Sequence, residues 1–84
     1  MSKASKLLKK TVNAFNAADP EAYFNALDKL LTLCEDSEEA EDYLYEVLAE
    51  AGTAAIRTTV ARQVLEKVWI RRGDEASFFR RLNE

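Results

Sequence analysis

The sequence predicts an all-α fold, a compact single domain over residues 1–84 in which about five helices form a bundle or an orthogonal array. Only two Gly and one Pro occur among the 84 residues, so few positions carry the residues that favour turns. Ala, Leu, Glu, Lys and Arg, all strong helix formers, dominate the composition. Hydrophobic residues make up 48% of the chain and charged residues 32%, which leaves enough apolar side chain for one core.

A first amphipathic helix is predicted over residues 3–18, and a second one directly after it. Small and apolar side chains recur at helical spacing on one side of the first: Ala4, Leu7, Leu8, Thr11, Val12, Phe15 and Ala18. Asp19 and Pro20 separate the two helices, because Asp is a good N-cap and Pro fits the first helical position. The second helix has a broad apolar side, formed by Tyr23, Phe24, Ala26, Leu27, Leu30, Leu31, Leu33 and Cys34. Its width predicts a central helix that packs on two sides.

A third helix is predicted from Asp36, a candidate N-cap with Glu39 at capping-box spacing, to Ala51 just before Gly52. The side chains expected to face the core are Ala40, Tyr43, Leu44, Val47, Leu48 and Ala51. Glu41 is expected to flank this core. The side chains expected to point outward are Glu38, Asp42, Tyr45, Glu46 and Glu50.

A fourth, long helix is predicted from Thr53, a candidate cap, to Arg72, with Gly73 ending it. Its core stripe consists of Val60, Ala61, Val64, Leu65, Val68 and Trp69. Ile56 and Ile70 fall on the opposite side, away from this stripe. A short last helix, capped by Asp74, is expected to fold back so that its apolar residues complete the core: Phe78, Phe79 and Leu82.

The chain lacks the residues that most catalytic and metal sites require. It contains no His and a single Cys, which excludes the usual triads, thiolate zinc sites and intrachain disulfides. Two isolated Gly cannot form a phosphate-binding loop. Cys34 lies on the apolar side of its helix beside Glu35 and Asp36, so it is expected to be a buried structural thiol. We therefore expect no enzymatic activity, no cofactor, no metal and a cytoplasmic location.

Charge is distributed unevenly along the chain. The net charge is −3, yet residues 35–52 contain eight acids and no base, which predicts a strong local negative field. The outer face of the third helix is therefore a candidate binding surface for a protein with a basic surface, through Glu38, Asp42, Tyr45, Glu46 and Glu50. Two alternatives stay open: the acids pair with arginines across the bundle, or they imitate a nucleic-acid backbone.

Two further surfaces complete the functional hypotheses. Ile56 and Ile70 are candidates for contact with a partner or for homodimer formation. Arg62, Lys67 and Arg71 would form the nucleic-acid face of a regulator that uses the basic C-terminal helices. The apolar runs are too short to span a bilayer, so no membrane partner is expected. The leading hypothesis is a non-enzymatic protein-interaction module, a small adaptor or inhibitor, and nucleic-acid binding is the alternative.

Overall fold

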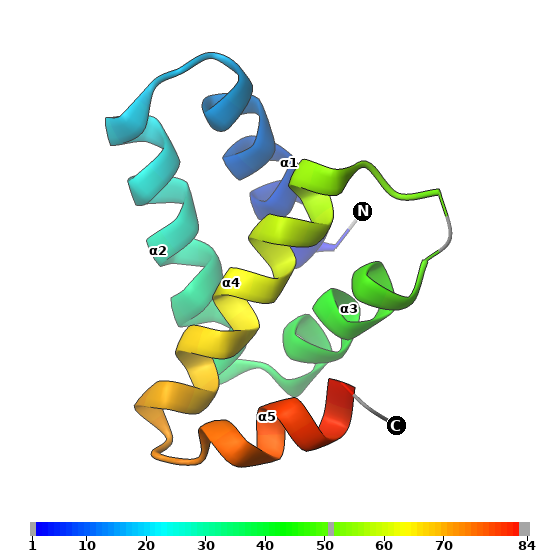
Figure 1. Ribbon diagram of the computed structural model, residues 1–84. Helices are drawn as coiled ribbons and strands as arrows, with labels where there is room; N and C mark the ends of the chain where they lie inside the picture. The colour runs from blue at the N-terminus through cyan, green and yellow to red at the C-terminus, as the bar shows by residue number, and fades with distance from the viewer. Residues whose placement is uncertain (1, 51, 83–84) are drawn as a thin grey trace.

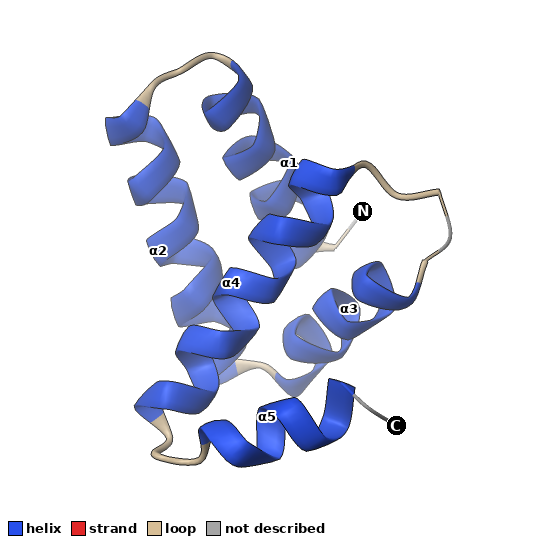
Figure 2. Ribbon diagram, in the orientation of Figure 1, coloured by secondary structure: helices blue, strands red, loops and turns tan. Residues whose placement is uncertain are grey.

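The computed structural model describes residues 2–50 and 52–82, and these form five helices and no strand (Figures 1 and 2). The helices are α1 (Lys3–Asn16), α2 (Pro20–Asp36), α3 (Glu38–Ala49), α4 (Ala55–Arg71) and α5 (Glu75–Leu82). They pack into a compact body with a Cα radius of gyration of 12.2 Å. The predicted all-α fold with about five helices is confirmed. In the described ranges, no helix is long and apolar enough to cross a bilayer.

Helix α4 occupies the centre of this body and packs against all four other helices. α1 and α2 form an antiparallel hairpin on one side of it, α3 lies on the other side, and α5 lies across its C-terminal end (Figure 1). The buried stripe of α4 consists largely of small and β-branched side chains, which lets the backbones of neighbouring helices approach closely. The sequence predicted a central second helix that packs on two sides. α2 does pack against α1, α3 and α4, but among the described helices only α4 contacts all the others and takes the central place.

The core forms around this stripe, as the sequence predicted. Val60, Ala61, Val64, Leu65 and Val68 are all 0% exposed. Buried side chains from the other helices surround them: Ala4, Leu8, Leu27, Leu30, Leu31, Cys34, Ala40, Leu44, Val47 and Phe78. The prediction for the tail is partly confirmed, because Phe78 is buried and Leu82 packs against the core. The prediction is wrong for Phe79, which is 41% exposed.

The turn between α1 and α2 begins earlier than predicted. α1 ends at Asn16, and Ala18 has a left-handed backbone with φ of 55°. The amides of Ala18 and Asp19 donate to the carbonyls of Phe15 and Ala14 at 3.0 and 3.1 Å, the pattern of a Schellman C-cap. Gly usually occupies this left-handed position. Because Ala occupies it here, the sequence did not reveal where the helix ends.

Two of the predicted helix caps are confirmed. The Asp19 carboxylate accepts a hydrogen bond from the amide of Ala22 at 3.1 Å. Asp74 likewise accepts from the amide of Ser77 at 3.2 Å, and its hydrogen bonds with Ser77 lower the pKa of Asp74. Each aspartate therefore satisfies an amide at the start of a helix that would otherwise lack a partner.

The predicted cap of the third helix is wrong by one residue. Asp36 is the last residue of α2, and the hydroxyl of Ser37 accepts from the amide of Ala40 at 3.3 Å. Both residue types are good N-caps. α2 continues through Asp36, so Ser37 is the single extended residue between α2 and α3. Ser37 is therefore the residue in position to cap α3.

The connection between α3 and α4 also differs from the prediction. α3 ends at Ala49, and Ala51, the predicted last residue, lies outside the described residues. Thr53 is not the cap of α4, because its hydroxyl donates to the carbonyl of Glu50 at 3.0 Å. α4 starts after Ala54 with no side-chain cap. Packing of its apolar stripe, rather than capping, therefore fixes where α4 lies.

Candidate functional site

The acidic outer face of α3 is exposed to solvent, but part of its charge is neutralised. Glu38, Asp42, Glu46 and Glu50 are all exposed. The first three recur every four residues along α3, and Glu50 caps its C-terminal end. Asp42 accepts a hydrogen bond from Arg81 of α5 at 3.2 Å. This face therefore has the predicted position, with one carboxylate already paired within the chain.

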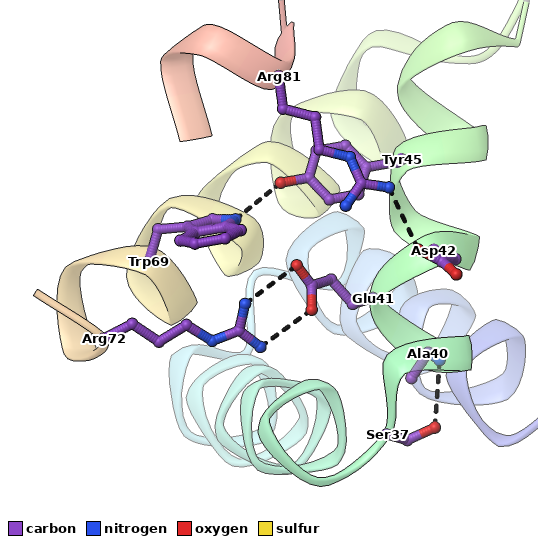
Figure 3. A network of polar contacts seen from close by, with 8 residues as sticks. All are labelled: Ser37, Ala40, Glu41, Asp42, Tyr45, Trp69, Arg72 and Arg81. Atoms are coloured by element: carbon purple, nitrogen blue, oxygen red, sulfur yellow. Dashed lines mark hydrogen bonds and ion pairs between the residues drawn. The ribbon is translucent and has the colours of Figure 1, made fainter. Parts of the chain in front are cut away.

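Tyr45 does not point outward as predicted. It is half-buried, and its hydroxyl accepts a hydrogen bond from the indole of Trp69 at 2.8 Å (Figure 3). The guanidinium of Arg81 stacks over the Tyr45 ring at 3.7 Å from its centroid. Burial raises the pKa of Tyr45, against the opposing effect of the hydrogen bond from Trp69. Tyr45 therefore joins α3 to α4 through Trp69 and to α5 through Arg81, and its ring packs against the core.

Glu41 is more deeply buried than predicted and holds α4 against α3. It is 5% exposed, and both of its carboxylate oxygens accept from Arg72, at 3.0 and 3.2 Å (Figure 3). The hydrogen bond to Glu41 raises the pKa of Arg72. The same guanidinium lies 4.7 Å from the ring centroid of Trp69. A charged group at this depth needs such a partner, because burying an unpaired carboxylate is costly.

A third ion pair joins the acidic segment to the end of α4, where Arg71 lies 2.6 Å from Glu35. In the described residues, the ion pairs from Arg71, Arg72 and Arg81 thus account for three of the eight acids of residues 35–52. The alternative that the acids pair with arginines across the bundle is therefore correct for part of the segment. The exposed remainder of the α3 face keeps its negative field.

The two isoleucines have different environments. Ile56 is half-buried and packs against the core, so the prediction that it lies away from the core is wrong. α4 contacts both α1 and α3, and its N-terminal end lies near them (Figure 1). Ile70, in the last turn of α4, is 52% exposed. Only Ile70 therefore keeps the exposed position that both were predicted to share.

The residues of the candidate nucleic-acid face do not form a purely basic surface. Arg62 and Lys67 are exposed on α4, but Arg71 is held by Glu35. Lys67 lines one hollow together with Asp28 of α2. Acids therefore lie among these bases, which weakens the positive field that attracts phosphates.

Exposed apolar side chains gather on the predicted apolar sides of the first two helices and at the end of α4. Phe15 is 53% exposed and Phe24 61%, and both rings pack edge-on against Tyr23, with centroids 5.9 and 5.3 Å away. Ile70 lies across a shared hollow from Tyr23 and Phe24. We call Phe15, Tyr23, Phe24 and Ile70 the aromatic patch. Phe15 and Phe24 lie on the apolar sides predicted for the first two helices, yet both rings remain exposed to solvent.

Three hollows surround the aromatic patch, and Phe24 lines all of them. One of about 380 Å³ lies at the α1–α2 turn, lined by Ala14, Phe15, Ala18, Asp19, Pro20, Tyr23 and Phe24. Another of about 470 Å³ lies between α2 and α4, lined by Tyr23, Phe24, Leu27, Gln63, Glu66, Lys67 and Ile70. We call this one the α2–α4 hollow. The third, of about 370 Å³, lies beside it and is lined by Phe24, Asn25, Leu27, Asp28, Leu31, Lys67 and Arg71.

The aromatic patch is exposed because α2 and α4 cross. The two helices meet near the C-terminal half of α2 and diverge toward its N-terminal half, which has α1 alongside (Figure 1). Leu27, Leu30 and Leu31 are therefore buried, whereas Phe24 is left open. The signal in the sequence was the breadth of the α2 apolar side, which exceeds what one neighbour can cover. α2 does pack against α1, α3 and α4, as that breadth predicts, but these neighbours leave Phe24 uncovered.

Cys34 occupies the predicted structural position and gives a prediction that can be checked directly. It is 1% exposed, and burial together with the nearby Glu41 carboxylate raises the pKa of Cys34 to about 12. In native protein at neutral to mildly alkaline pH, we expect reaction with Ellman's reagent to be at least about a hundredfold slower than in denaturant, because the thiolate is scarce and shielded. Similar rates in the two states would contradict this burial.

Known proteins do not identify this chain. Among the described residues, no three acidic or cysteine side chains come together as possible metal ligands. Function is therefore inferred from the geometry and chemistry of the chain's own surface. A scan against protein-family models, a search of curated proteins and a search of solved structures found no match.

Proposed function

We propose that this chain is a non-enzymatic protein-interaction module, a small adaptor or inhibitor, and that its principal docking surface is the aromatic patch. One observation carries the proposal: Phe15, Phe24 and Ile70 are each more than half exposed around connected hollows in a chain of only 84 residues. Contiguous apolar patches on soluble proteins mark interaction sites. Aromatic side chains beside pockets are also the residues that concentrate binding energy.

The patch is organised before any partner arrives. Tyr23 is fixed between the two phenylalanine rings, and its hydroxyl donates to the side-chain carbonyl of Gln63 on α4 at 3.1 Å. These contacts restrict the rotamers of the aromatic side chains. Less conformational entropy is then lost on binding, so more of the apolar contact appears as affinity.

The acidic face of α3 supports the same function from a different side of the molecule. α3 lies on the far side of α4 from the N-terminal half of α2 (Figure 1), and Glu38, Glu46 and Glu50 are exposed there. An unbalanced row of carboxylates accelerates encounters with a basic protein surface more than it adds affinity. We therefore assign to this face the attraction of a basic protein, with a rate that falls as salt rises.

The test compares partner capture by matched variants. A tagged chain is used to recover proteins from the source cells, with Phe24→Ser as the test variant and Phe79→Ser as the control, since Phe79 is an exposed phenylalanine on α5. Loss of an aromatic anchor costs about 2 kcal/mol or more, which is about a 30-fold loss of affinity. We expect Phe24→Ser to abolish capture and Phe79→Ser to preserve it.

Two outcomes of that comparison would contradict the proposal. One is recovery of the same proteins by Phe24→Ser and by the unmodified chain. The other is recovery of no specific protein, at low as well as physiological salt. Circular dichroism of both variants shows whether they are folded, and an exposed site such as Phe24 should tolerate the change.

Nucleic-acid binding through Arg62, Lys67 and Arg71 stays the alternative prediction. The exposure of Arg62 and Lys67 on α4 supports it. The ion pair of Arg71 with Glu35 and the position of Asp28 beside Lys67 count against it. A duplex would meet carboxylates as well as cations on this side of the molecule.

A further inference from the structure

The aromatic patch combines a protruding side chain with a hollow of matching character. Phe24 is the most exposed large hydrophobic side chain within residues 2–50 and 52–82, at 61%, and it lines the α2–α4 hollow. That hollow has a volume of about 470 Å³, enough to accept an aromatic ring. A surface with a knob beside a hole can pair with itself about a two-fold axis, because each knob then enters the hole of the other copy.

The charges around the patch also suit self-pairing. The two hollows between α2 and α4 are bordered by two acids, Asp28 and Glu66, and by two bases, Lys67 and Arg71. Arg71 is already paired with Glu35, which leaves charges of both signs, Asp28, Glu66 and Lys67, to face another molecule. In a two-fold dimer a surface faces its own copy, so a surface with a single sign of charge would repel itself, whereas a mixed one can place opposite charges together.

We propose that the occupant of the aromatic patch is a second copy of this chain, in a two-fold dimer in which Phe24 of each copy enters the α2–α4 hollow of the other. This inference rests on the proposed function and deepens it by naming the partner at this surface. A stable interface typically covers about 800 Å² per partner. That is roughly a seventh of the 5352 Å² surface of the chain.

The dimer would leave the acidic faces of both α3 helices available. These faces cannot form the self-association surface, because Glu38, Glu46 and Glu50 would meet the same carboxylates in the other copy. α3 also lies on the far side of α4 from the N-terminal half of α2 (Figure 1). The dimer would then present two equal acidic surfaces. A basic partner with repeated binding sites could occupy both, and the second contact would raise the overall affinity because it forms within the same complex.

The experiment is sedimentation equilibrium of the full chain at micromolar to millimolar concentration. The unmodified chain is expected to dimerise, and Phe24→Ser to weaken the dimer about 30-fold. Lys67→Glu leaves the rim with excess negative charge and is expected to weaken the dimer about tenfold at low salt. The double variant D28K/K67E restores the balance and should return the dimerisation constant to within about threefold of the original. Phe79→Ser serves as the control that leaves dimerisation unchanged.

Each failure has a separate meaning. A monomer at every concentration overturns the dimer; if Phe24→Ser still abolishes partner capture, the proposed function stands and another protein occupies the patch. A dimer unaffected by Phe24→Ser overturns the assignment of the dimer to this surface. A further outcome is that the double variant D28K/K67E fails to restore dimerisation although it and Lys67→Glu are both folded by circular dichroism. In that case the two-fold pairing of the charges around the hollows is wrong. If Phe24→Ser changes neither dimerisation nor capture, the inference and the proposed function both fall.

Discussion

Phe78→Ala is expected to destabilise the chain by about 3–5 kcal/mol, the usual cost of deleting a buried phenylalanine side chain. Phe78 is 0% exposed and is the fully buried side chain that α5 contributes to the core, with Leu82 packing at its edge. A chain of this size typically has a total stability of only about 4–13 kcal/mol. The loss of Phe78 would therefore remove a large share of it.

The Phe78→Ala change is expected to weaken more than the packing around the missing ring. α5 packs against α4, and Arg81 of α5 covers the ring of Tyr45 and binds Asp42. When Phe78 no longer anchors α5, these contacts to α3 are lost together with it. Urea denaturation followed by circular dichroism would measure the change in the free energy of unfolding.

The matched control is the neighbouring phenylalanine. Phe79→Ala removes a side chain that is 41% exposed and should cost less than about 1.5 kcal/mol, most of it from its ring contact with Phe78. Equal effects of the two variants would show that α5 does not pack on the core through Phe78.

Arg72→Met is expected to destabilise the chain by about 2–3 kcal/mol, because it leaves the carboxylate of Glu41 buried without a partner. The cost is below the 3–5 kcal/mol typical of fully buried pairs, since the Arg72 side chain is 38% exposed and the Glu41 side chain only 6%. The same asymmetry predicts that Glu41→Leu costs less, about 1 kcal/mol, because a released Arg72 can turn toward water.

A double-mutant cycle measured by urea denaturation checks this interpretation. Glu41→Leu combined with Arg72→Met replaces the pair with apolar side chains of similar size, and the double variant should be more stable than Arg72→Met alone. If instead the two single effects add, the ion pair does not couple the two sites. If Glu41→Leu is the worse single variant, the assignment of Glu41 as the dominant buried charge is wrong.

Much of the fold follows from local patterns in the sequence. The spacing of Val60, Val64 and Val68 predicted the buried stripe of α4, and the structure confirms it. Asp19 and Asp74 marked two helix starts, because a short acceptor side chain ahead of a helical segment satisfies free amides. Where two good caps stood side by side, at Asp36 and Ser37, the local pattern could not choose between them.

The candidate surfaces were predicted less completely. The exposed carboxylates of α3 could be read from helical periodicity, and Glu38, Glu46 and Glu50 lie as expected. The burial of Glu41 was not foreseen, because it depends on Arg72 reaching across from another helix. Tyr45 was misplaced for the same reason, since its partners Trp69 and Arg81 are distant in sequence.

The sequence by itself determined that this chain is helical, where most of its helices lie and which stripe of α4 forms the core. These properties depend on residues within a few positions of one another, whose geometry is set by the helical repeat. The tertiary structure alone decided that α4 is central, that Glu41 is buried and that Phe15 and Phe24 are exposed. Where two helices cross determines which part of a broad apolar side is covered, and that crossing depends on packing between segments far apart in the chain.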